Sequence, residues 1–463
     1  MIIENSKTIS PTYSPNKRFT GWLKLFADRI ETRKKVKIKT NNTLDTLDKI
    51  VFFMIGLLPK KRQIILKRKN CKEKTIDLLI KLCHNILMKR IGIFGGTFSP
   101  VHSEHVALAK VSLSKLNLDK LFVLPTFVSP HKTGVSASPE DRLNMLKLAF
   151  SGEEKIEVND FEIARGEVSY SYITAEHFKS QYNAEIFMLV GADMLKDFKT
   201  WRYPERILSA VTLVACQRED NKVDLKEEIE YIKNTFHAGV IELDFCGKAQ
   251  SSTKIRTYAS LGLSVEDFTD KKVAEYIKEK GLYKGGEIEK FVSSVLPLKR
   301  LVHTANVITS ALLWAKRLNL NEETVKIAGA LHDVAKYLDP SDYKGFILEK
   351  DVPKPVVHAF LGAFIAENVL KITNQDVINA VRYHTSGRPN MSDLEKLIFV
   401  ADMVEEGRTY DGVDILREHY QKDFNKCFIE CLKEETLHLK NKKAEIYRLT
   451  LQAHEYYVKG ENI

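Results

Sequence analysis

At 463 residues the chain is long enough for two or three domains, each with an apolar core of its own. Its residues are 44% hydrophobic, 9% aromatic and 29% charged, which is typical of globular proteins and excludes a wholly disordered or fibrous chain. The net charge of +10 is unevenly distributed, because residues 1–90 hold 22 of the 71 Lys and Arg but only 7 of the 61 Asp and Glu. The other 373 residues carry a net charge of −5, so the basic balance gives no reason to expect nucleic-acid binding by the rest of the chain.

Residues 1–87 combine polar stretches, the basic clusters RKKVKIK and KKRQIILKRK, and the apolar run IVFFMIGLL at 50–58. This run has about half the length that spans a bilayer, and it lies too far from the start for a secretory signal. We predict a poorly ordered basic extension, with a nucleic-acid or membrane-surface arm as the alternative. The six cysteines are scattered, which argues against a disulfide scaffold and indicates a reducing cytoplasm.

From residue 88 onward, short apolar runs alternate with amphipathic segments. We expect strands at RIGIFGG, KLFVLP, KIEVND, EIFMLVGAD and VTLVACQR, and helices from about Val106, from about Pro139 and over SYSYITAEHFKSQ. Apolar runs rich in β-branched residues, separated by helices, are typical of a parallel sheet. The sequence therefore predicts an α/β domain over residues 88–284, with a Rossmann-like doubly wound parallel sheet.

The first of these strands runs into GGTFSPVHSEH, residues 95–105. A Gly-Gly turn between a strand and a helix places backbone N–H groups and the positive end of a helix dipole at the carboxyl edge of the sheet. His102 and His105, three residues apart at the helix start, can donate to the same bound anion. The later segment SSTKIR adds N-cap hydroxyls, more helix amides and Arg256, which suits a polyphosphate.

Together the two segments resemble the HxGH and ISSTxIR signatures of the nucleotidylyltransferase superfamily. Between them, FVSPHKTG, DRLNMLKLAF, VSYSYITAEHF and FMLVGADMLKDFKTWRYPERIL resemble successive motifs of bacterial nicotinate-nucleotide adenylyltransferases, over nearly all of residues 88–284. The related pantetheine-phosphate enzymes lack the GAD…TWR block. The resemblance implies that ATP and nicotinate mononucleotide react to deamido-NAD and diphosphate, with Mg²⁺ on the pyrophosphate and no protein nucleophile.

The same resemblance implies a role for each matching residue. Trp201 would stack on the pyridine ring and Asp193 would orient the nucleotides, although Trp201 could also be a half-exposed packing residue. The catalytic phosphate contacts would be His102, His105, Lys132 and Arg256. The remaining nucleotide contacts would be Gly95, Gly96, Thr97, Phe98, Ser251, Ser252 and Thr253.

Three positions depart from the family pattern. This chain has Ser99, Glu104 and Gln250 where the family usually has Asp, Gly and an apolar residue, respectively. Ser99 can still accept an N–H at its turn. Glu104 matters more, because a carboxylate between the two histidines would repel ATP if it pointed inward. On a helix it can also face away, and the sequence leaves both orientations open.

After Gly286 the strand signals end, and segments such as NVITSALLWAKRL and DLEKLIFVADMVEEG repeat apolar residues at spacings of three and four. This pattern predicts an all-helical domain over residues 287–463, joined by a short glycine linker. Within it, GALHDVAK sets His332 and Asp333 side by side in an apolar helix. Burying both without partners would cost several kcal/mol, and a divalent metal ion would remove that cost.

The order H…HD…D, with two further histidines, resembles the two-metal branch of the HD superfamily of phosphohydrolases. The wider segments are similar to YqeK-like HD proteins over residues 287 to about 455, which implies symmetrical cleavage of diadenosine tetraphosphate into two ADP, with iron as the favoured metal. Asp333 would bridge the two ions and act in catalysis. The implied metal ligands are His303, His332, Asp333, His358, His384 and Asp402, and the implied polyphosphate contacts are Lys336, Arg388 and Arg408.

Two alternatives stay open at this point. Both folds could serve other substrates, with a different acceptor nucleotide and an HD domain that cleaves (p)ppGpp or cyclic dinucleotides. One domain could also have become a nucleotide-binding regulatory module. In each case we expect a cytoplasmic protein without a transmembrane segment, with small nucleotides as partners and homo-oligomers as a possible assembly.

Overall fold

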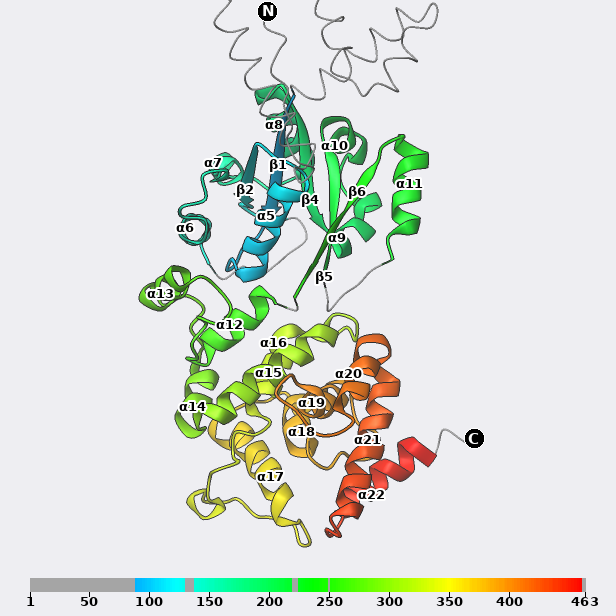
Figure 1. Cartoon of the computed structure of the whole chain (residues 1–463). Coiled ribbons are helices and arrows are strands. Elements are labelled where there is room, and N and C mark those ends of the chain that lie inside the picture. Colours follow the sequence, from blue (N-terminus) through cyan, green and yellow to red (C-terminus); the bar gives the residue numbers. More distant parts are fainter. Residues whose placement is uncertain (1–87, 130–136, 219–223, 249, 460–463) are drawn as a thin grey trace, which may run out of the picture. The chain divides into compact units, whose positions relative to one another are not determined.

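The structure is a computed structural model that describes residues 88–129, 137–218, 224–248 and 250–459. A six-stranded parallel sheet forms the centre of its first half (Figure 1). The described residues belong to one unit that starts at Met88. The predictions for residues 1–87 and for Lys132 lie outside the described residues. The strands are β1 (Lys89–Gly96), β2 (Lys120–Pro125), β3 (Ile156–Val158), β4 (Ala184–Gly191), β5 (Thr212–Arg218) and β6 (Val240–Gly247).

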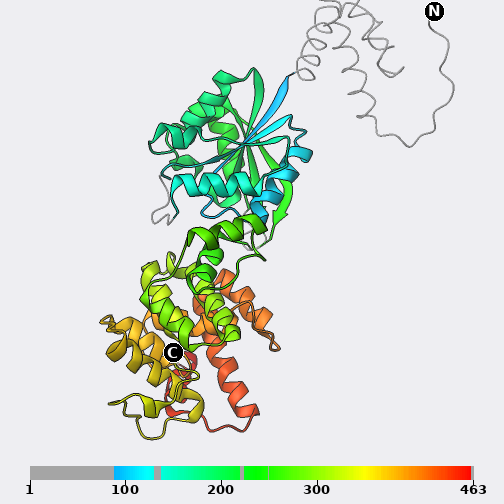
Figure 2. The same cartoon turned by 90° about the vertical axis from the view of Figure 1, so that its left-hand side faces the viewer.

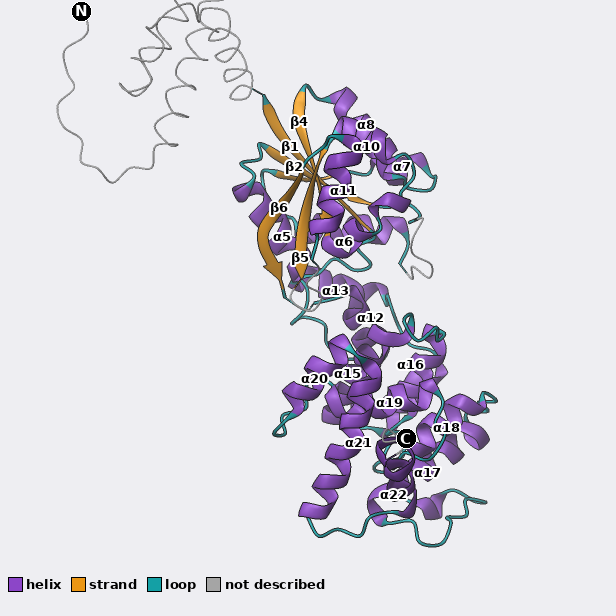
Figure 3. Cartoon of the chain, turned by 90° about the vertical axis from the view of Figure 1, so that its right-hand side faces the viewer, coloured by secondary structure: helices purple, strands orange, loops and turns teal. Residues whose placement is uncertain are grey.

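Both faces of the sheet are covered by helices (Figure 3). Along β1, Ile91 and Ile93 belong to the apolar cluster on one face, whereas Phe94 belongs to the cluster on the other. Burial on both faces explains why the strands read as nearly continuous apolar runs. Gly92 leaves room for the packing around it, because a Cβ there would lie 2.5 Å from Leu121 Cδ1.

The strand order is β3-β2-β1-β4-β5-β6, so the connections reverse direction between β1 and β4. Doubly wound sheets bind ligands at the carboxyl ends of the strands at this reversal. The Gly95–Gly96 turn and Gly191 lie there, at the ends of these two neighbouring strands. The fold predicted for this half of the chain is therefore confirmed.

The predicted strands are all present, and the structure adds β6. This strand lies at the edge of the sheet and buries few of its residues, such as Leu243. Its sequence, VIELDFCG, therefore lacks the apolar run that marked the other strands.

The helices of this half begin close to the predicted positions. Ser138 accepts the Asp141 N–H and caps the helix that starts at Pro139, as predicted. The first helix starts at Ser103 rather than near Val106, because His102 already occupies its N-cap position. The helices are α5 (Ser103–Lys115), α6 (Pro139–Ala149), α7 (Phe161–Arg165), α8 (Ser171–Gln181), α9 (Ala192–Lys196), η1 (Phe198–Thr200), α10 (Pro204–Ala210), α11 (Lys226–Phe236), α12 (Ser252–Ser260) and α13 (Lys271–Lys280).

Beyond Gly286 the described chain contains helices and no strands, as predicted (Figure 2). The α-helices are α14 (Glu287–Val295), α15 (Leu298–Ala315), α16 (Glu322–Leu331), α17 (Val357–Phe364), α18 (Gln375–Tyr383), α19 (Asp393–Val404), α20 (Val413–Lys422), α21 (Phe424–Asn441) and α22 (Arg448–His454). Shorter turns are η2 (Pro340–Asp342), η3 (Lys354–Val356), η4 (Ile365–Val369) and η5 (Glu455–Lys459). Among the described helices, none has the length and apolarity needed to cross a membrane.

The two halves share one apolar cluster. It includes Tyr258 and Leu261 at the end of α12 as well as Leu301 and Ala305 on α15. The glycine linker is packed rather than open, because a Cβ on Gly285 would lie 2.4 Å from the backbone oxygen of Ser260. Contacts between α12 and the helical half are therefore part of the core.

Candidate active sites

The turn after β1 presents its backbone at the edge of the sheet. Phe98 has a left-handed backbone with φ of 48°, and its ring is 2% exposed. The ring lies beneath Gly96, where an added Cβ would come within 3.0 Å of it. Phe98 therefore packs beneath the turn. Nucleotide contacts are predicted for Gly95, Gly96, Thr97 and Phe98, and because its ring is buried, Phe98 can make its contact only through backbone groups.

The two histidines of the turn lie against each other. The His102 N–H donates to His105 Nδ1 at 3.2 Å, and the two rings stack with centroids 3.6 Å apart. When Nδ1 of a neutral imidazole accepts a hydrogen bond, the ring proton is on Nε2. His105 is thereby set to offer an Nε2–H donor at the start of α5, which suits a phosphate oxygen.

The segment SSTKIR lies directly against this turn, about 150 residues away in sequence. The Ser252 hydroxyl donates to the Pro100 carbonyl at 2.8 Å, and Arg256 Nη1 donates to the Ser99 carbonyl at 2.8 Å. Ser251 caps α12 by accepting the Lys254 N–H, and Thr253 accepts from Arg256 Nη2 at 3.0 Å. The structure therefore brings the two predicted phosphate-binding segments together.

Arg256 has no carboxylate partner among the described residues, and burial lowers the pKa of its guanidinium group. The Glu322 carboxylate raises this pKa less than burial lowers it, and a half-buried cation that forms no ion pair among the described residues favours an anionic ligand.

Glu104 does not point between the histidines. Its Oε2 accepts the Lys248 N–H at 2.9 Å, and a Cβ on Gly247 would lie 3.2 Å from the same oxygen. The carboxylate therefore holds the end of β6. The other two departures are also accommodated, because the Ser99 hydroxyl lies 3.2 Å from the Tyr283 hydroxyl and the Gln250 side chain donates to the Phe268 carbonyl at 3.4 Å.

The residues predicted to orient the nucleotides follow β4. Asp193 is exposed in the first turn of α9, next to the end of β1. Trp201 is half-buried and packs on Phe198, with ring centroids 5.3 Å apart. Both lie on the part of the chain that leaves the carboxyl edge of the sheet, and their predicted roles stay untested.

Arg142 on α6 was not among the predicted site residues. It is 1% exposed, and its guanidinium donates to the Thr97 carbonyl at 2.9 Å and to the Phe127 carbonyl at 3.2 Å. It thus joins the loops that follow β1 and β2. A charged residue on the apolar side of the segment PEDRLNMLKLAF was the signal that could have identified it.

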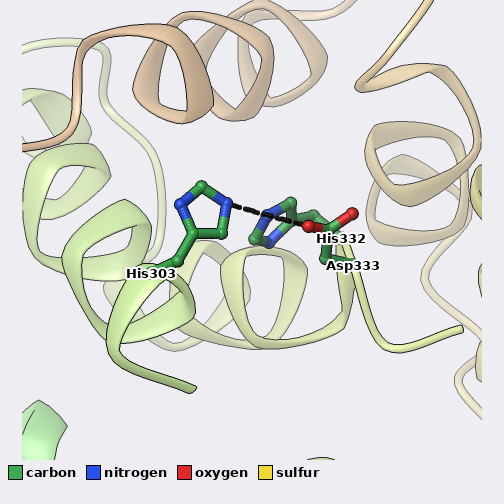
Figure 4. A group of neighbouring side chains, drawn as sticks. All are labelled: His303, His332 and Asp333. Carbon is green, nitrogen blue, oxygen red and sulfur yellow. Dashed lines mark hydrogen bonds and ion pairs between the residues drawn. The ribbon is translucent and has the colours of Figure 1, made fainter. Parts of the chain in front are cut away.

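The second site gathers the ends of several helices of the second half. His303 comes from α15, and His332 and Asp333 follow α16 directly (Figure 4). His358 lies on α17 and His384 follows α18. His332, Asp333, His358 and His384 are at most 7% exposed, so the predicted metal ligands are brought together in a buried cluster.

The two oxygens of Asp333 face different histidine pairs. Oδ2 lies 3.7 Å from His303 Nε2 and 3.8 Å from His332 Nε2. Oδ1 lies 3.1 Å from His358 Nε2 and 3.6 Å from His384 Nε2. Each pair, together with Asp333, forms a group that could hold one metal ion, and the shared carboxylate would bridge the two.

The orientation of the imidazoles tests whether a metal fits. His332 Nδ1 lies 2.7 Å from the Gly329 carbonyl and His384 Nδ1 lies 2.8 Å from the Val381 carbonyl, so each Nδ1 is the protonated donor. His303 Nδ1 likewise faces the Glu405 carboxylate at 3.1 Å. The Nε2 atoms of His303 and His332 then lie 3.3 Å apart, and a cation bound by both nitrogens would fit this arrangement.

The pKa shifts of His332 and Asp333 agree with a ligand set. Burial lowers the pKa of His332 to about 3, so this imidazole is neutral at pH 7. Burial would raise the pKa of Asp333, but the neighbouring imidazoles of His332, His358 and His384 bring it well below the usual range. Burial also lowers the pKa of His303, but its contacts with Asp402 and Glu405 raise it above the ordinary value, so this imidazole has to lose a proton when a metal binds. Neutral imidazoles and an ionised carboxylate are the forms that bind a divalent ion.

Asp402 lies on α19 with Oδ1 3.1 Å from His303 Nε2, and it pairs with Arg408. Three cations lie around the cluster, because Lys336 Nζ is 3.6 Å from Asp333 Oδ1 and Arg300 Nη1 is 2.7 Å from Asp333 Oδ2. Arg300 was not predicted, although it precedes His303 by one helical turn. These three side chains are 24% to 35% exposed, so they can also reach a ligand.

Arg388 has a different environment. Its Nε and Nη2 donate to the buried Glu395 carboxylate, at 2.8 and 2.6 Å, and this carboxylate also takes part in the cap of α19. The pair gives Arg388 a structural function. Its predicted contact with a polyphosphate stays untested.

Family models match both halves of the chain. The cytidylyltransferase-like model matches residues 93–258, and the HD domain model matches residues 300–407. A protein of Mycoplasma genitalium named "Probable nicotinate-nucleotide adenylyltransferase/Ap4A hydrolase" is 30% identical over 340 residues, which cover 71% of this chain and 92% of that protein. The chain belongs to the nicotinate-nucleotide adenylyltransferase/Ap4A hydrolase family.

Each half of this family member also matches single-domain proteins. The "Bis(5'-nucleosyl)-tetraphosphatase, symmetrical" of Bacillus subtilis is 31% identical over 176 residues, 36% of this chain and 95% of that protein. A protein of Thermotoga maritima named "Probable nicotinate-nucleotide adenylyltransferase" is 40% identical over 197 residues, 42% of this chain and 93% of that protein. The chain is therefore a nucleotidyltransferase joined to an HD hydrolase, as the sequence resemblance implied.

Proposed function

We propose that the first site transfers the adenylyl group of ATP to nicotinate mononucleotide, giving deamido-NAD and diphosphate. A phosphate oxygen of the mononucleotide attacks the α-phosphorus of ATP, and the bond from that phosphorus to the bridging oxygen of the leaving diphosphate breaks. His102, His105 and Arg256 neutralise the developing charge, together with the amides of the turn after β1. The predicted contact of Lys132, the stacking of Trp201 and the Mg²⁺ ion on the pyrophosphate belong to the same proposal.

We propose that the second site hydrolyses diadenosine tetraphosphate symmetrically. Water adds to one of the two central phosphorus atoms, the central P–O–P bridge breaks, and two ADP leave. A metal pair held by His303, His332, Asp333, His358, His384 and Asp402, with iron as the expected metal, would supply the activated hydroxide. Arg300, Lys336 and Arg408 provide positive charge for the phosphates.

One observation carries both proposals: the chain holds two separate polar clusters, each with the groups that its reaction needs. The phosphate-binding turn is tied to α12, and Asp333 offers one oxygen to each histidine pair. The boundaries 88–284 and 287–463 for the two domains fit these clusters. Cytoplasmic location, homo-oligomers and the absence of nucleic-acid binding by the catalytic domains stay predictions from the sequence.

An activity panel on full-length protein tests the proposal. Wild type, His105→Ala, Asp333→Ala and the control His438→Ala, an exposed histidine on α21, are assayed for both reactions. His105→Ala should lose adenylyl transfer by at least about 100-fold and keep hydrolysis, and Asp333→Ala should do the reverse. Nicotinamide mononucleotide and pantetheine phosphate as acceptors, and (p)ppGpp and cyclic dinucleotides as hydrolase substrates, test the alternatives. A preference for any of these overturns the corresponding half of the proposal.

A further inference from the structure

A hydrogen-bonded chain of buried side chains leads from the adenylyltransferase helix α12 to the metal cluster. The Tyr258 hydroxyl, on α12, donates to Asn306 Oδ1 on α15 at 2.7 Å. Asn306 Nδ2 donates to Glu405 Oε2 at 3.0 Å, and Glu405 Oε1 accepts from His303 Nδ1 at 3.1 Å. The three linking residues are 6%, 4% and 2% exposed, so water cannot easily replace any of these bonds.

Glu405 is held in one orientation. Its Oε2 also accepts the Gly407 N–H at 2.6 Å, and a Cβ on Gly407 would lie 3.0 Å from this oxygen. Glu405 thus has three hydrogen-bond partners, His303, Gly407 and Asn306. A carboxylate in this fixed position turns Nδ1 of the His303 ring toward itself and leaves Nε2 facing the metal cluster.

Asn306 fixes which group donates and which accepts in the series of hydrogen bonds from Tyr258 to His303. Its amide can donate to Glu405 only through Nδ2, and its Oδ1 then needs a donor, which is the Tyr258 hydroxyl. Without this hydroxyl, a buried amide oxygen loses its partner and the amide can rotate. The orientation of Glu405, and through it that of His303, therefore depends on a side chain of the other domain.

We propose that Tyr258 and Asn306 are positioning residues for the HD metal site, so that the adenylyltransferase domain supplies part of the support of the hydrolase centre. The inference rests on the proposed metal site and adds to it a dependence on the first domain. It concerns metal binding, which can be measured without turnover. Partners that orient a ligating histidine typically change metal affinity by about 10- to 100-fold when they are lost.

The test measures Co²⁺ binding to full-length protein by visible absorption, which reports the number and geometry of the ligands. Asn306→Asp puts a carboxylate against Glu405 and should weaken binding about 10- to 100-fold. Tyr258→Phe removes one hydrogen bond and should weaken it about fivefold. Both variants should keep adenylyl transfer, which shows that the protein is folded.

Two matched controls separate this effect from general loosening. Tyr420→Phe deletes another buried hydroxyl bonded to α15, at the Ser310 carbonyl, and does not touch the chain to His303. Glu406→Gln removes the ion pair with Lys254, which joins α12 to the segment that follows α19, next to Glu405. Both controls should bind Co²⁺ within about twofold of wild type.

The outcomes distinguish the two proposals. If wild type binds Co²⁺, Asp333→Ala does not, and Asn306→Asp and Tyr258→Phe bind like wild type, the positioning role is overturned and the metal site stands. Equal losses in the controls and in the two variants also overturn it. If wild type and Asp333→Ala bind Co²⁺ alike, the metal site itself is wrong, and the inference fails with it.

Discussion

At the scale of single residues, the chemistry of each candidate histidine depends on which of its ring nitrogens is hydrogen-bonded to a neighbouring group. Backbone carbonyls accept hydrogen bonds from Nδ1 of His332 and His384, and the Glu405 carboxylate faces Nδ1 of His303. In the first site the direction is reversed, because a backbone N–H donates to Nδ1 of His105. The same residue type would therefore serve as a metal ligand through Nε2 in one proposed site and as an Nε2–H donor to phosphate in the other.

Glu104 gives a residue-scale prediction. Because its carboxylate accepts the Lys248 N–H, Glu104→Gln should keep this bond through the amide oxygen and change kcat/KM for ATP by less than about threefold. Glu104→Gly should lower the free energy of unfolding by about 0.5–1.5 kcal/mol, because the bond at the end of β6 is lost. Steady-state kinetics and urea unfolding measure the two effects. A tenfold rise in kcat/KM for the glycine variant would show instead that the carboxylate repels ATP.

At the scale of elements, the first site is an assembly of loops held by side chains from elsewhere. The turn after β1 receives bonds from α12 through Ser252 and Arg256, and from α6 through Arg142. Since the loop itself has no ladder hydrogen bonds beyond the end of β1, its shape depends on these donors. The positions of its amides thus follow from helix packing.

Arg142 gives the prediction at this scale. Arg142→Leu removes a buried charge but leaves the Thr97 and Phe127 carbonyls without their donor, and each such loss costs about 1–3 kcal/mol. We expect a lower free energy of unfolding and a higher KM for ATP, with hydrolysis of diadenosine tetraphosphate unchanged. Lys147→Leu, at an exposed position of the same helix, is the control. A wild-type KM in Arg142→Leu would show that the turn keeps its shape without this residue.

At the scale of the molecule, residues 88–463 are joined by a shared core rather than by a loose linker. One apolar cluster includes residues of the sheet, of α12 and of α15, and Gly285 is packed against the Ser260 carbonyl. Elements that share a core tend to unfold together.

The molecule-scale prediction concerns metal removal. A metal that binds the folded state stabilises it by mass action, by about 2.7 kcal/mol at 100 times the dissociation constant. Because the core is shared, chelation should lower the temperature at which adenylyl transfer is lost as well as that at which hydrolysis is lost. Heat inactivation of both activities, with and without a chelator, measures this. The Asp333→Ala variant should show no effect of the chelator, and a shift in hydrolysis alone would mean that the halves unfold independently.

The sequence by itself determined the two fold classes, and it predicted a domain boundary near residue 285 and most of the residues described in the two candidate sites. Apolar runs, helical spacing and short motifs depend on residues close together in the sequence, so they can be recognised without the structure. It did not reveal β6, whose edge position removes the apolar pattern, nor Arg300 or Arg142, whose roles depend on loops distant in sequence.

Only the tertiary structure decided where Glu104 points, which oxygen of Asp333 faces which histidine pair, and that Tyr258 of one domain contacts Asn306 of the other. The physical reason is that these contacts join segments far apart in the sequence, 144 residues for Glu104 and Lys248 and 48 for Tyr258 and Asn306, or depend on single atoms of one side chain. These contacts depend on how whole helices and strands pack, and a pattern within a few consecutive residues does not predict that packing.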